Sequence, residues 1–99
     1  MDRINFFGSV SGIEYPEMIV NFFDHFIALK QIVEDSGTIT VLNSDDKSIS
    51  FSIEFNNVDS KNYALSTIYS SGGNIVIYER LISIKVDILT DLSIKINLT

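Results

Sequence analysis

The sequence predicts an α+β domain in which one long helix packs across a curved antiparallel sheet. Two patterns lead to this prediction. Residues 15–34 carry apolar side chains at helical spacing, and most of the chain after Gly37 alternates apolar and polar residues with a period of two. A helix with an apolar face and strands with an apolar side can bury these surfaces against each other. We therefore expect a single globular domain over residues 1–99.

The predicted elements begin with a strand at residues 3–10, followed by the long helix. Pro16 suits the first helical turn, because its missing N–H has no intrahelical partner there, and Gly37 is a stop signal beyond the last turn. The apolar face is wider than a coiled-coil seam, so we expect this helix to lie on a sheet. That face comprises Met18, Ile19, Val20, Phe22, Phe23, Phe26, Ile27, Leu29 and Val33.

Three strands are predicted next, at residues 38–43, 47–55 and 62–70. The second has the clearest alternation in the chain, with its apolar residues on one side and serines and a glutamate on the other. Residues 43–46 between the first two favour a turn. For residues 62–70 the alternation favours a strand, although Asp59 could instead cap a short helix that begins at Ser60.

The last part of the chain is predicted to form further strands. Residues 71–73 read as a hairpin turn, and residues 74–89 are too long for one ordinary strand. Within this stretch the apolar residues shift from odd-numbered to even-numbered positions, a change of apolar parity. Either a bulge near residues 79–80 therefore reverses the register or the segment is buried on both sides. A tight turn at residues 90–91 leads to a final strand at residues 92–99.

The predicted order is therefore β-α-β-β-β-β-β. In architecture alone this outline resembles cystatin-like proteins and various small inhibitors and immunity proteins. No motif from those families is present in the sequence, and a shared fold does not by itself imply a shared function.

Composition and charge limit the classes of function. The formal net charge is −6, which argues against direct nucleic-acid binding through phosphates and is compatible with a basic protein or nucleoprotein partner. There is no cysteine, no apolar run long enough for a membrane span, and no signal-peptide pattern at the N-terminus. We expect a cytoplasmic protein that binds neither a membrane nor a cofactor.

No pattern in the sequence indicates catalysis or a metal site. His25 is the only histidine, and we interpret it as a surface residue, because Asp24 beside it on a helix does not face it. Residues 43–46 offer oxygen ligands but lack the spacing, the glycine and the distal glutamate of an EF-hand loop. We therefore predict that the protein is not an enzyme and that it has neither catalytic nor metal-binding residues.

Two surfaces are candidates for binding. The first is an acidic set for a partner, formed by Glu17, Asp24, Asp35, Asp45 and Asp46. The second is a surplus of apolar side chains that one helix cannot cover, with Ile75, Ile77, Tyr78 and Leu81 as a possible self-interface.

These surfaces lead to two hypotheses. In the first, the protein is a small acidic inhibitor of the toxin-immunity or phage anti-defence type, which acts by occluding a basic partner. In the second, it is a non-enzymatic structural or assembly module that forms a homodimer or larger homo-oligomer through its sheet.

Overall fold

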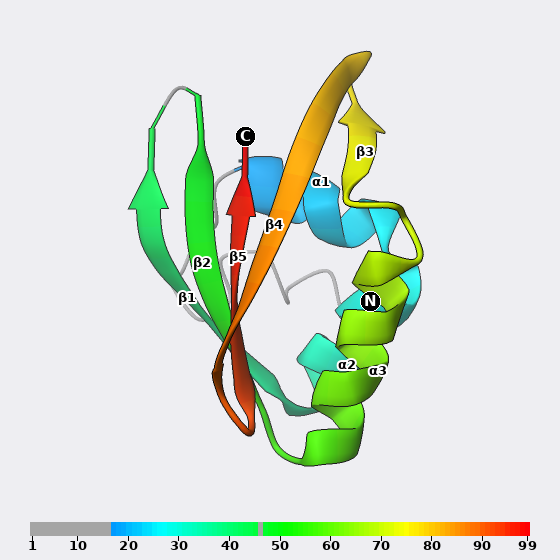
Figure 1. Cartoon of the computed structure of the whole chain (residues 1–99), viewed down its shortest axis with the longest axis vertical. Helices are drawn as coiled ribbons and strands as arrows, with labels where there is room; N and C mark the ends of the chain where they lie inside the picture. The colour runs from blue at the N-terminus through cyan, green and yellow to red at the C-terminus, as the bar shows by residue number, and fades with distance from the viewer. Residues whose placement is uncertain (1–16, 46) are drawn as a thin grey trace.

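The computed structural model describes residues 17–45 and 47–99, which form three helices and a five-stranded antiparallel sheet (Figure 1). The predicted α+β class is therefore confirmed. No helix in the described ranges has the length and apolar character needed to cross a membrane. In chain order the elements are α1 (Glu17–His25), α2 (Ile27–Ser36), β1 (Gly37–Ser44), β2 (Ile49–Phe55), α3 (Val58–Tyr69), β3 (Asn74–Ile77), β4 (Arg80–Thr90) and β5 (Ser93–Leu98).

The sheet has the order β1-β2-β5-β4-β3, and each neighbouring pair is antiparallel. Helices lie on one side of it (Figure 1). The side chains that face the helices form the core, and those on the outer side are mainly Ser, Thr, Asn and Lys. The fully buried large side chains are Ile19, Phe22, Phe23, Leu29, Phe51, Ile53, Phe55, Ile68, Ile82, Ile94, Ile96 and Leu98.

The predicted single helix is in fact two helices, which meet at Phe26. Phe26 has φ −113° and ψ 76°, outside the helical range. The ring of Phe22 lies 5.1 Å from that of Phe26 and 5.6 Å from that of Phe51, between centroids. Each such aromatic pair contributes about 0.5–1.5 kcal/mol beyond burial, so the three rings stabilise the contact between the helices and β2. Phe26 is buried as a result, whereas Ile27, which was predicted on the apolar face, is 61% exposed.

The prediction of a strand at residues 62–70 is wrong, because this stretch lies within helix α3. Asn57 begins the helix, and its side-chain oxygen accepts a hydrogen bond from the Ser60 N–H at 2.8 Å. The sequence alternative of a short helix was therefore nearer the structure, although its cap is Asn57 rather than Asp59. The buried residues follow helical spacing and are Lys61, Ala64, Leu65 and Ile68.

The long stretch at residues 74–89 is divided into β3 and β4 by a turn at Tyr78 and Glu79. This turn, rather than a bulge within one strand, changes the parity, so that Ile75 and Ile77 point into the core. The turn predicted at residues 71–73 joins α3 to β3 and does not close a hairpin.

The strands predicted at residues 38–43, 47–55 and 92–99 are confirmed as β1, β2 and β5. The strand predicted at residues 3–10 and the helix start at Pro16 lie outside the described residues. Over the described residues the order is α-α-β-β-α-β-β-β, so the predicted order is wrong there. Helix α3 between β2 and β3 also departs from the cystatin-like outline.

Candidate protein-binding surface at the β3–β4 hairpin

The exposed apolar residues of the described chain are concentrated most at the tip of the β3–β4 hairpin. Val76 and Leu81 lie opposite each other on the outer side of the two strands and are 59% and 68% exposed. Tyr78 at the tip is 72% exposed, the highest value among the large apolar and aromatic residues. We define the hairpin surface as Val76, Tyr78, Glu79, Arg80 and Leu81.

The turn that carries this surface has an unfavourable backbone conformation. Tyr78 has φ 52° and Glu79 has φ 64°, so both central residues of the turn have positive φ, as in a type I′ hairpin. Such turns favour Asn-Gly, because the left-handed region costs other residues about 1–2 kcal/mol each. Strained residues of this kind cluster at functional sites. The hairpin therefore holds two large side chains at positions where smaller residues would be more stable.

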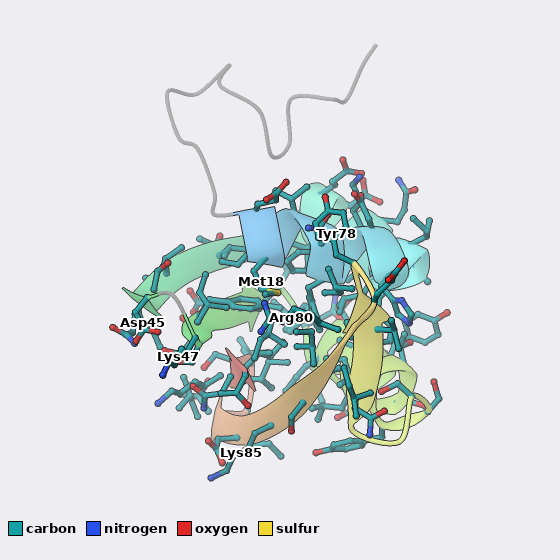
Figure 2. All side chains as sticks on the ribbon, turned by 90° about the horizontal axis from the view of Figure 1, so that it is seen from above. Met18, Asp45, Lys47, Tyr78, Arg80 and Lys85 are labelled. Atoms are coloured by element: carbon teal, nitrogen blue, oxygen red, sulfur yellow. The ribbon has the colours of Figure 1, made fainter. Side chains whose placement is uncertain are left out.

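One hydrogen bond ties the turn to the first helix. The Tyr78 hydroxyl donates to Glu17 Oε2 at 3.3 Å, and both side chains are exposed. Tyr78 lies beside α1, whereas Arg80 extends from the hairpin in a different direction (Figure 2). The contact with Glu17 places a carboxylate next to the exposed aromatic ring, and Glu79 adds a second carboxylate in the turn itself.

Arg80 contributes one positive charge to the hairpin surface. It is exposed and lies opposite Ile77 at the start of β4. Its guanidinium forms neither an ion pair nor a hydrogen bond with any residue in the described ranges. Arg80 shares the helix-facing side of the hairpin with Ile77, whereas Val76 and Leu81 lie on the outer side. Tyr and Arg are the side chains most enriched where single residues dominate binding energy. The composition of the hairpin surface therefore suits contact with a protein.

The structure does not gather the predicted acidic set into one patch. Glu17 and Asp24 occupy opposite ends of α1, Asp35 lies at the end of α2, and Asp45 lies at the tip of the β1–β2 hairpin. Asp24 is paired, because its Oδ1 lies 3.1 Å from Lys30 Nζ. Asp46 lies outside the described residues. Of the set, only Glu17 adjoins the hairpin surface.

Asp45 has a local structural role in its turn. Its Oδ1 accepts hydrogen bonds from the backbone N–H groups of Lys47 and Ser48, each at 2.9 Å. These two bonds favour the charged carboxylate and hold the pKa of Asp45 below its usual 3.8. The carboxylate therefore stabilises the β1–β2 turn that was predicted at residues 43–46.

The predicted self-interface is split between core and surface. Ile75 and Ile77 are buried against the helices, and only Tyr78 and Leu81 remain exposed. Val76, Glu79 and Arg80 were not predicted to belong to a surface. The change of apolar parity between Ile77 and Ile82 was the signal that could have found them, because it marks the place where the chain must turn outward.

Of the described residues considered for chemistry, His25 ends α1 and Asp45 lies in the β1–β2 turn. His25 is exposed, and its ring packs edge-on against Phe26 with centroids 4.9 Å apart. Within residues 17–45 and 47–99, no three His, Asp or Glu side chains come together as metal ligands.

Comparisons of the chain with protein-family models, with curated proteins and with solved structures gave no match.

Proposed function

We propose that this chain is a cytoplasmic, non-enzymatic binding protein that inhibits a basic partner protein by covering part of its surface. The observation that carries the proposal is the exposed tyrosine at the strained tip of the β3–β4 hairpin. Tyr78 is held at positive φ on a turn that glutamate and tyrosine make less stable, and Leu81 is exposed on the outer side of the same hairpin. A partner that buries this tip would offset that cost through contact with the two side chains.

The charge of the chain supports a basic partner. A net charge of −6 gives the protein a field that speeds encounter with a positive surface, and this acceleration weakens as salt rises. Glu17 and Glu79 place carboxylates at the contact itself. Arg80 is a single charge of opposite sign there, and it would orient the partner by requiring one acidic group in a fixed position.

This arrangement suits the toxin-immunity or phage anti-defence type of inhibitor. Such a protein needs only a small, stable domain that presents one complementary surface. The described domain meets this requirement, because its core is continuous and the hairpin surface lies outside it.

The test compares the hairpin surface with an equally exposed tyrosine elsewhere. Wild-type protein, a Tyr78→Ala/Leu81→Ala variant and a Tyr69→Ala control are immobilised, and proteins retained from an extract of the source cells are quantified. Tyr69 is also exposed but lies at the end of α3. We expect a basic protein to be retained by wild type and control and to fall by about tenfold or more with the double variant, as for interface residues worth about 2 kcal/mol.

The measured association rate of the retained partner should also fall as salt is raised. Equal retention by all three proteins, or a retained partner whose association rate does not depend on salt, would contradict the proposed function.

Self-association through the sheet is the second candidate function. The predicted self-interface cannot serve as a whole, because Ile75 and Ile77 belong to the core. The observation that favours this candidate is the outer edge of β1, which pairs with no other strand in the described ranges.

A further inference from the structure

Strand β1 exposes an edge that no described strand covers. It is the first strand of the sheet order β1-β2-β5-β4-β3 and pairs only with β2. The opposite edge is different, because β3 has only four residues and packs beside α1. Natural edges are usually protected by charges, proline, bulges or short length. β1 has eight residues, with no charge and no proline, and its one protection is a bulge between Val41 and Asn43.

Hydrogen bonds in the sheet show which backbone groups of β1 point outward. The Phe55 N–H donates to Leu92 O at 2.8 Å, so Phe55 directs its backbone groups toward β5 and away from its partner Gly37. The Gly37 N–H accordingly donates to Val33 O rather than to β2. Because direction alternates along an antiparallel ladder, Thr38 and Thr40 bond to β2, and Ile39 and Val41 face the open edge.

No hydrogen bond to the outward groups of Ile39 or Val41 comes from any residue in the described ranges. The open edge thus presents two N–H and two C=O groups, separated by Thr40. Beyond Val41 the bulge ends this regular series.

We propose that two copies of this chain pair through their β1 edges, antiparallel, about a two-fold axis at Thr40. In this register Ile39 of each copy lies opposite Val41 of the other, and the two pairs exchange four backbone hydrogen bonds. An axis at Ile39 would place Val41 opposite Gly37, whose N–H already donates to Val33. An axis at Val41 would place Ile39 opposite Asn43, beyond the bulge. The axis at Thr40 alone uses all four free groups of each copy.

Pairing with a second copy would cover apolar side chains of β1 that water contacts in the monomer. Ile39 and Val41 are on the core side, and Val41 is 38% exposed there. Their pairing across the axis joins β-branched side chains on the same face, which stabilises neighbouring strands. Since β1 is uncharged in a chain of net charge −6, the two acidic molecules can approach at this edge without placing like charges opposite each other. The two sheets would then continue into one.

The test uses the absence of cysteine in the natural chain. Thr40→Cys places one thiol at the proposed axis, where facing Cα atoms of a non-hydrogen-bonded pair lie about 4.5 Å apart, within the range of a disulfide. Thr38→Cys is the matched control, on the same strand and side. Its two copies would lie about 14 Å apart along the strands, too far for a bond.

Under mild oxidation we expect Thr40→Cys to form a covalent dimer about tenfold or more faster than Thr38→Cys, because pairing raises the local thiol concentration. Sedimentation of the wild type should show its mass rising with concentration from 11.1 kDa toward twice that value. A Val41→Lys variant should remain a monomer, since a charge at the edge opposes pairing. Circular dichroism of each variant checks that the fold is retained.

Equal oxidation rates for the two cysteine variants, or a wild type that stays monomeric at millimolar concentration, would overturn the proposal. This pairing does not depend on the inhibitor function, because β1 and the β3–β4 hairpin lie at opposite edges of the sheet. Failure of one experiment therefore leaves the other proposal intact.

Discussion

The two turns that flank β3 meet the same backbone requirement with different residues. Before β3, Gly72 and Gly73 have φ 81° and 89°; after β3, Tyr78 and Glu79 have φ 52° and 64°. Glycine adopts positive φ without a steric cost, whereas tyrosine and glutamate do not. The turn before the four-residue strand β3 therefore has glycines, which adopt positive φ without strain, whereas the turn after it has strained residues.

The surroundings of the two turns differ as well. The glycine turn is tied down locally, since Ser71 Oγ donates to Ile68 O at 2.7 Å and the Gly72 N–H donates to Tyr69 O at 3.0 Å. In the turn after β3, the side-chain hydrogen bond within the described residues is the one from the Tyr78 hydroxyl to Glu17 Oε2, at 3.3 Å. The first turn therefore serves the fold, and under the proposed function the second keeps two strained residues because their side chains contact a partner.

The largest expected effect concerns the strand between the turns. Both turns act to hold β3 with Ile75 inward, so Ile75→Ala should destabilise the protein by about 2–4 kcal/mol through lost burial and a cavity. Val76→Ala on the exposed side is the control and should change stability by less than about 0.5 kcal/mol. Urea unfolding monitored by circular dichroism measures both. Similar losses for the two variants would mean that β3 is not oriented by its turns as described.

A smaller loss is expected at the glycine turn. Gly73→Ala adds a Cβ that meets no neighbouring atom within 4 Å, so its effect comes from the backbone alone. Since φ is 89° there, we expect a loss of about 1–2 kcal/mol in the free energy of unfolding. Thermal unfolding would measure the loss. An unchanged midpoint would show that this turn can leave the positive-φ region freely. Glycine would then not be required in the turn before β3.

The strained turn should respond with the opposite sign. Glu79→Gly relieves a positive φ and should stabilise the protein by about 1 kcal/mol. The same change removes a carboxylate from the hairpin surface, so retention of a basic partner should decrease while stability rises. Urea unfolding and the retention assay test the two halves separately. A variant that loses stability would show that the glutamate supports the turn rather than a partner.

The smallest effect is expected at a third turn, between β1 and β2. The folded-state pKa of Asp45 is lowered by bonds from Lys47 and Ser48, so its contribution to stability is present above 3.8, the unfolded value, and disappears as the pH falls through the lower folded value. Asp45→Asn keeps a similar side chain without the charge. The difference in unfolding free energy between the two proteins should therefore shrink as the pH falls from about 6 to about 3. A difference in unfolding free energy that does not change with pH would mean that the shape of the Asp45 side chain, rather than its charge, stabilises the turn.

Much of the fold could be predicted because its strongest signals are local. The alternation from Ile49 to Phe55 is uninterrupted, and it identified β2 and its buried side directly. The break at Phe26 could not be predicted, since the spacing of Phe26 from Phe22 suits a continuous helix and neither proline nor glycine marks the position. Helix α3 was missed because Tyr63 and Tyr69 suggest alternation, although both are exposed and the buried residues follow helical spacing.

The candidate surface was only partly predictable for a related reason. The surplus of apolar residues around Tyr78 and Leu81 was visible, and both are exposed. The turn itself was hidden, because tyrosine followed by glutamate is not a turn-forming pair. Sequence patterns reveal a turn when its residues are chosen for the backbone, and they conceal it when the residues are chosen for their side chains.

The position of β5 has a consequence for how the protein is made. This strand follows all the others in the sequence, yet it lies between β2 and β4. During synthesis, the β1–β2 and β3–β4 hairpins can each form, but they cannot be joined until residues 93–98 leave the ribosome. Until then each half displays an unpaired strand and open apolar side chains, a state prone to aggregation. The nascent chain thus depends on six late residues to close its sheet.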